Sequence, residues 1–108
     1  MAEVAVTASA GPATPAQVSD ALERNPGSQR LRERGWTPMW FEAQVTVDGT
    51  TGEHLHSVVW VEPGRSAAEV AEEELEQALD EALRNLRDYE GLDVWPDDVV
   101  DRTLRVSD

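Results

Sequence analysis

Cysteine and lysine are both absent from this chain of 108 residues, and no long apolar run interrupts its polar sequence. The lack of cysteine excludes disulfide bonds and thiolate metal sites, so packing must stabilise the fold. No segment has the apolar length of a transmembrane helix, and residues 1–15 lack the basic leader and apolar core of a secretory signal. We therefore expect a cytoplasmic protein that makes no contact with membranes.

Positive charge is scarce and unevenly placed. The formal net charge is −13 at pH 7. Residues 1–41 hold four acidic groups and four arginines, whereas residues 42–108 hold 18 acidic groups and five arginines. Such a field repels phosphate backbones and attracts basic protein surfaces. The charge argues against direct binding of nucleic acid and is compatible with a partner protein that presents a basic surface.

The N-terminal region divides into a polar tail and a helix start. Residues 1–13 are rich in alanine, threonine, serine, glycine and proline without periodicity, which predicts a disordered tail before a single domain at 14–108. Thr14-Pro15-Ala16-Gln17 supplies a cap, a proline in the first turn and a glutamine at the third position. This predicts an N-terminal helix over residues 15–24, followed by a short helical segment at 28–34.

A β-hairpin is indicated in the middle of the chain. Period-two alternation predicts strands at 39–47 and 54–62, joined by the turn-rich residues 48–52. One face of this hairpin is apolar, and the other mixes aromatic and polar residues. We expect the register that places Trp40 directly opposite Trp60, while a shift of two residues would separate the indoles by one diagonal step. Both rings share one face in either register.

The C-terminal half predicts one long helix and one strand. Ser66-Ala67-Ala68-Glu69 is a capping box that opens a helix to about Glu90, with Gly91 as its C-terminal cap. Its apolar stripe predicts packing on one sheet face. Residues 99–106 alternate, with Arg102 interrupting the apolar side, and predict a short third strand added to the hairpin. The fold class is therefore α+β: an N-terminal helix, an antiparallel β-hairpin, a long amphipathic helix on one sheet face and a short third strand.

The aromatic residues mark a candidate docking surface. Four of the six are tryptophan, and bulky indoles with a polar N–H suit a contact surface better than a small core. Trp40 and Trp60 lie on the polar face of the hairpin. Either the N-terminal helix covers this face or it forms an exposed hot spot for a partner. The predicted partner-binding residues are Trp36, Trp40, His56, Val58 and Trp60.

Motifs for catalysis or metal binding are missing. The sequence holds no nucleophile elbow, phosphate-binding loop or dinucleotide fingerprint, so we predict no catalytic residue and no cofactor. His54 and His56 project from one strand face near Glu42, but zinc needs further ligands, and we predict no metal site. The aspartates at 93–101 lack the glycine and the terminal glutamate of an EF-hand loop. The two histidines could still make the hairpin sensitive to pH between 5 and 8.

Two functions follow from these observations. The leading one is a non-enzymatic protein-binding or assembly component, for instance an accessory subunit or a virion-type structural protein, that docks another protein or a second copy through the tryptophan-bearing face. The alternative is an acidic inhibitor that imitates nucleic acid and occupies a DNA- or RNA-binding protein. A solvated helix face explains the same acids without any function. The acidic face consists of Glu69, Glu72, Glu73, Glu76 and Asp80.

Overall fold

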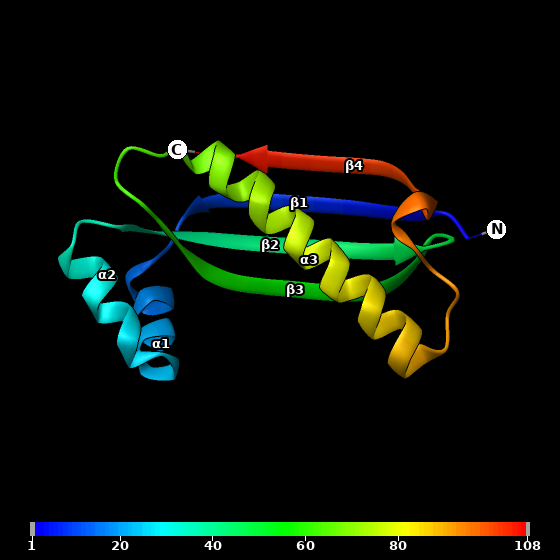
Figure 1. Ribbon diagram of the computed structural model, residues 1–108, viewed down its shortest axis with the longest axis horizontal. Coiled ribbons are helices and arrows are strands. Elements are labelled where there is room, and N and C mark those ends of the chain that lie inside the picture. The colour runs from blue at the N-terminus through cyan, green and yellow to red at the C-terminus, as the bar shows by residue number, and fades with distance from the viewer. Residues whose placement is uncertain (1, 108) are drawn as a thin grey trace.

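The computed structural model describes residues 2–107, and within them four strands form one mixed sheet with a long helix across one face (Figure 1). This confirms the α+β class. The strand order is β3-β2-β1-β4, in which only β1 and β4 are parallel. The strands are β1 (Val4–Pro12), β2 (Thr37–Val47), β3 (Thr50–Val61) and β4 (Val99–Val106), and the helices are α1 (Pro15–Arg24), α2 (Gln29–Glu33) and α3 (Ala67–Glu90), with 3-10 turns η1 (Pro26–Ser28) and η2 (Pro96–Asp98).

The strand β1 corrects the prediction of a disordered tail at residues 1–13. It lies inside the sheet, between β2 and β4, and the prediction is wrong for its nine residues; Met1 lies outside the described residues. Four small apolar side chains alternate along it and are buried beneath α3. Alanine is less common in strands than β-branched residues, but its small side chain fits where a helix packs closely on the sheet. The buried residues of β1 are Val4, Val6, Ala8 and Ala10.

The strand β4 has the predicted bounds but a different neighbour. It pairs with β1 in parallel rather than adding to the hairpin, because the segment taken for a tail stands between them. The pairing shifts after Val99, so Val99 packs against the core while Val100 is exposed. Arg102 points to the helix side, where its guanidinium pairs with Glu72 and Glu76 of α3. The arginine that interrupts the apolar pattern of β4 is therefore held by the helix.

The hairpin of β2 and β3 is tighter than expected. Asp48 and Gly49 alone form its turn, with φ angles of 51° and 81°, which is the geometry of a two-residue hairpin turn. This turn pairs Val47 with Thr50, and a bulge between Val45 and Thr46 then changes the pairing by one further residue. Beyond the bulge the register is shifted by two residues from the expected one, and Trp40 lies opposite Val58 rather than Trp60. An even shift preserves the faces, so the predicted partition of side chains between the two faces holds.

The helix α3 has the predicted capping residues, Ser66 and Gly91, at its two ends. The Ser66 hydroxyl accepts a hydrogen bond from the Glu69 N–H at 3.1 Å, and Gly91 adopts a left-handed conformation with φ of 67°. The helix crosses the sheet diagonally (Figure 1) and buries one stripe against it. No helix in residues 2–107 combines the length and apolar character needed to cross a membrane. The buried stripe consists of Val70, Ala71, Leu75, Ala78, Leu79, Ala82, Leu83 and Leu86.

The predicted N-terminal helix is α1, and α2 follows the short turn η1. Thr14 caps α1 reciprocally: its hydroxyl accepts from the Gln17 N–H at 3.2 Å, and its own N–H donates to the Gln17 side chain at 2.8 Å. The two helices lie together at the end of the sheet where β2 begins and β3 ends (Figure 1). Most of the sheet face opposite α3 therefore has no helix over it.

Candidate protein-binding face

The sheet has one face under α3 and one face turned away from it, which we call the outer face. Strand alternation and the observed register assign the outer-face residues. Those on β1 and β4 are short or charged and exposed, whereas several on β2 and β3 are aromatic or apolar and half-buried. The outer face comprises Thr7 and Ser9 on β1, Trp40, Glu42 and Gln44 on β2, His54, His56, Val58 and Trp60 on β3, and Thr103 and Arg105 on β4.

Four side chains of the outer face form a connected group, which we call the aromatic cluster: Trp40, Glu42, His54 and His56. The Trp40 and His56 rings stack with centroids 5.2 Å apart, and the His54 ring meets His56 edge-on at 5.8 Å. The Trp40 Nε1–H donates to Glu42 Oε1 at 2.6 Å. The other Glu42 oxygen lies 3.8 Å from His54 Nε2. Each member therefore restrains another, and the indole N–H is satisfied although Trp40 is only half-buried.

The helix α1 borders the aromatic cluster without covering it. A hollow of about 210 Å³ separates them; α1 contributes Gln17, Asp20, Ala21 and Arg24, and the sheet contributes Trp40, His56, Ser57 and Val58. Trp40, Val58 and Trp60 remain half-buried, and His54 and His56 are exposed. Both arrangements considered from the sequence are therefore present in part, since the helix flanks the tryptophan face and leaves it accessible.

The structure brings most of the predicted partner-binding residues together. Trp40, His56 and Val58 meet around one hollow, and Trp60 lies two residues further along β3, opposite Pro38. Trp36 precedes β2, where its backbone N–H donates to the Leu31 carbonyl oxygen at 3.1 Å. Trp36 therefore lies in the turn between α2 and β2. Among the ring contacts of the described residues, none links Trp36 to the aromatic cluster.

Sequence reasoning overlooked Glu42 as the residue that joins the cluster. The sequence does indicate that Glu42 can contact Trp40, because the two residues are two positions apart and so project from the same strand face. The sequence does not determine the strand register, which places Glu42 opposite His56 and Gln44 opposite His54. The carboxylate can therefore reach the indole along its own strand and an imidazole across to the next.

Trp95 is exposed in a different part of the molecule. Its side chain stands near the end of α3, with the Arg87 guanidinium 4.0 Å from the ring centroid. The indole N–H donates to Asp93 Oδ1 at 2.7 Å, and Arg87 donates to the Val94 carbonyl at 2.8 Å. Val94 is fully buried. These contacts fix the segment between α3 and β4, which gives Trp95 a structural role and makes it a useful comparison for Trp40.

The acidic face of α3 is largely paired with arginines of the same chain. Arg65 reaches Glu73 with two hydrogen bonds of 2.9 Å, which lower the pKa of the Glu73 carboxyl, and it lies 3.8 Å from Glu69. Arg102 holds Glu72 at 2.9 Å and also pairs with Glu76. Four of the five acids predicted to imitate phosphates thus already have a cationic partner.

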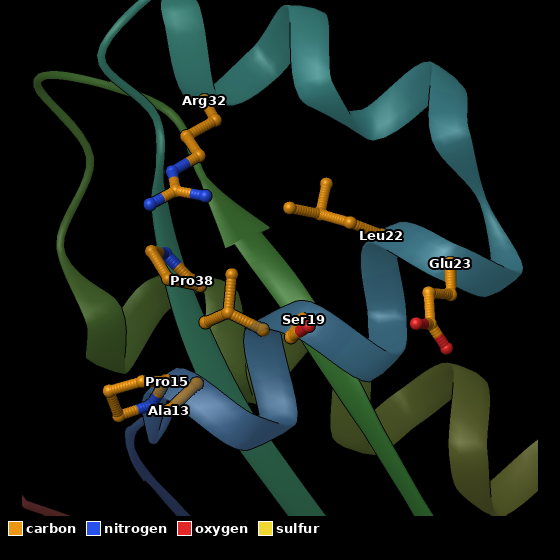
Figure 2. A pocket seen from close by; sticks show the side chains of 8 residues that line it. Ala13, Pro15, Ser19, Leu22, Glu23, Arg32 and Pro38 are labelled. Carbon is orange, nitrogen blue, oxygen red and sulfur yellow. The ribbon is translucent and has the colours of Figure 1, made fainter.

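A hollow of about 560 Å³ lies between α1, α2 and β2 (Figure 2). Leu22 points into it from α1, and Arg32 extends from α2 toward Pro38 of β2 (Figure 2). Val18 and Pro15 add further apolar lining. Ser19 and Glu23 of α1 complete the lining with polar groups. We assign this hollow to the packing of the two short helices.

Within residues 2–107, no three histidine, aspartate or glutamate side chains are grouped so as to hold a metal ion. His54, His56 and Glu42 do not form such a group: the two imidazole rings meet edge-on, and a Glu42 oxygen lies 3.8 Å from His54 Nε2. Comparisons of the chain with models of known families, with curated proteins and with solved structures found no match. The function is therefore inferred from the geometry of the chain itself.

Proposed function

We propose that this protein is a non-enzymatic binding component that docks another protein, or a second copy of itself, through the outer face of β2 and β3. One observation carries the proposal: half-exposed Trp40, Val58 and Trp60 lie on a sheet face that α3 leaves uncovered. Large aromatic side chains dominate the energetics of protein interfaces, especially where neighbouring polar groups surround them. The outer face has this composition.

The aromatic cluster supports the proposal because its side chains are already held in place. Glu42 restrains the Trp40 indole through a hydrogen bond, and His56 stacks on the same ring. A partner that binds a preorganised surface loses less side-chain entropy on docking. The flanking helix α1 adds an ion pair between Arg24 and Asp20, 3.4 Å apart, at the rim.

The test compares the double variant Trp40→Ala/Trp60→Ala with the single variant Trp95→Ala. Trp95 is a matched control because it is also accessible but lies outside the outer face. Sedimentation velocity measures self-association, and affinity capture from the native host at low and high salt measures partner binding. We expect the double variant to lose association at both salt concentrations, with helix content by circular dichroism unchanged. Association that survives in the double variant contradicts the proposal.

The acidic-inhibitor alternative remains a prediction that the ion pairs of α3 do not favour. A partner would have to compete with Arg65 and Arg102 for four of the five acids. Binding through that face would weaken steeply with salt and fail after charge reversal at Glu72, Glu73 and Glu76, whereas docking through aromatic side chains should tolerate salt.

A further inference from the structure

The strand β3 presents a free edge on one side of the sheet. It is the outermost strand, bonded to β2 alone. Among the turn and loop backbone hydrogen bonds of the described residues, none involves β3. An edge strand exposes a row of N–H and C=O groups that can pair with another chain. The edge is bordered near Ser57 by α1.

A hollow of about 300 Å³ runs beside this edge, between β3 and α3. Its apolar surface comes from Phe41, Leu55 and Ala78, of which Phe41 and Ala78 are buried core residues. Glu74 and Glu81 of α3 contribute acidic groups to the same lining. His54, His56 and Ser57 of β3 complete the lining. The hollow therefore combines an apolar floor with two carboxylates and two imidazoles, next to backbone groups that can form strand pairs. We call it the edge groove.

The two carboxylates of the edge groove have no cation of their own. Among the ion pairs of the described residues, none includes Glu74 or Glu81. Burial and the neighbouring charge of Glu81 raise the pKa of the Glu74 carboxyl. Four other acids of α3 pair with Arg65 or Arg102, namely Glu69, Glu72, Glu73 and Glu76. An incoming positive charge would relieve the repulsion in the edge groove.

A second copy of this chain is a poor occupant for the edge groove. Two β3 edges that paired with each other would bring the acids of both α3 helices to one interface, where like charges repel. Arg102 on β4 is already engaged by Glu72 and Glu76. The negative charge of the edge groove therefore favours a segment of another protein that carries basic residues.

We propose that the edge groove receives an extended basic segment of a partner protein, which adds to β3 as a fifth strand. The proposal rests on the protein-binding function above and names the chemistry of the partner. Side chains of an added strand alternate between the groove and the outer face. Glu74 and Glu81 are one heptad apart on α3, roughly 10 Å along the helix axis. Arginines four residues apart on a strand are about 13 Å apart and can reach both carboxylates with flexible side chains.

The predicted pattern is arginine or lysine, any residue, a small apolar residue, any residue, and a second cation. The central apolar side chain would lie over Leu55 and Phe41, and the two intervening side chains would extend beside His54 and His56 on the outer face. The main chain would supply hydrogen bonds, and the cations would supply specificity.

The probe is a fluorescein-labelled heptapeptide, Gly-Arg-Thr-Val-Thr-Arg-Gly, titrated into the full chain at low salt. Fluorescence anisotropy reports binding, and nuclear Overhauser contacts to the backbone of residues 54–57 report strand addition. A peptide with proline replacing valine is the control for main-chain pairing, because proline has no N–H. We expect the valine peptide to bind with contacts to residues 54–57 and the proline peptide to lose binding. Absence of binding, or contacts elsewhere, overturns the proposal.

The role of the two carboxylates is tested with Glu74→Gln/Glu81→Gln. The matched control is Asp80→Asn/Asp97→Asn, which changes the net charge equally at exposed sites outside the groove. We expect at least about a tenfold loss of peptide affinity in the first variant and almost none in the second. Equal losses would show non-specific charge attraction and overturn the proposal. Glutamine preserves the shape of each side chain, and thermal unfolding checks that both variants fold.

The two proposals fail in distinguishable ways. Host partners that still bind Glu74→Gln/Glu81→Gln but not Trp40→Ala/Trp60→Ala would overturn strand addition and leave docking through the outer face intact. Partners that still bind the tryptophan double variant would contradict the proposed function itself. Loss of host partners from both double variants, together with the peptide contacts at β3, supports strand addition beside the outer face.

Discussion

The two faces of the sheet carry side chains of different character on the same strands. The face under α3 carries apolar side chains that exclude water, including Val6, Phe41 and Val45, each at most 1% exposed. At the adjacent positions of the same strands, the outer face carries Thr7, Trp40 and Gln44. Antiparallel hairpins commonly divide in this way, with one side packed and one side solvated. The buried core therefore uses the side chains of one face, and the side chains of the other face are available for binding.

The difference between the two faces is tested most strongly by placing a charged residue on each side of β1. Val6→Asp would bury an unpaired carboxylate beneath α3, at a cost of several kcal/mol against a total stability of about 5–15 kcal/mol. Thr7→Asp places the same group on the exposed side of the strand. We expect Val6→Asp to abolish the cooperative thermal transition and Thr7→Asp to retain it. Equal melting of the two variants would show that β1 is not an interior strand.

A smaller effect distinguishes the two neighbours on β2. Phe41→Ala should lower the free energy of unfolding by about 3–5 kcal/mol, because it empties a fully buried site. Trp40→Ala should cost only about 1–2 kcal/mol, because its ring is half exposed despite its greater size. Urea denaturation followed by circular dichroism measures both. If Trp40→Ala is as damaging as Phe41→Ala, the outer face contributes a second core.

The smallest expected effect concerns Glu74 beside the edge groove. Because its pKa is raised in the fold, ionisation of this carboxyl destabilises the folded state. The cost is present at neutral pH and disappears as the pH falls through the raised pKa. Glu74→Gln should therefore raise the melting temperature by about 1–4 °C at pH 7. The gain should shrink near pH 4, and a gain independent of pH would contradict a charge effect.

Local signals in the sequence predicted the elements that begin and end with recognisable residues. The capping residues Thr14 and Ser66, the alternation of the hairpin and the stripe of α3 gave correct helices and strands. The faces of Trp40 and Trp60 were also predictable, because side-chain direction on a strand survives any even shift of register.

The missed features depend on contacts between distant parts of the chain. The strand β1 contains alanine, glycine and proline, which are uncommon in strands, and its pairing with β4 joins opposite ends of the sequence. The exact hairpin register follows from a shorter turn than expected at Asp48 and Gly49 together with a bulge between Val45 and Thr46. The edge groove depends on the diagonal path of α3 over β3, which no local pattern encodes.

The most direct measurement of the central claim is hydroxyl-radical footprinting of the tryptophans, read by mass spectrometry. It compares the free chain with the same chain bound to a captured partner. Docking through the outer face predicts that Trp40 and Trp60 are oxidised in the free chain and protected in the complex, while oxidation of Trp95 stays unchanged. Equal oxidation of Trp40 and Trp60 in the two states, or protection of Trp95 alone, would contradict it.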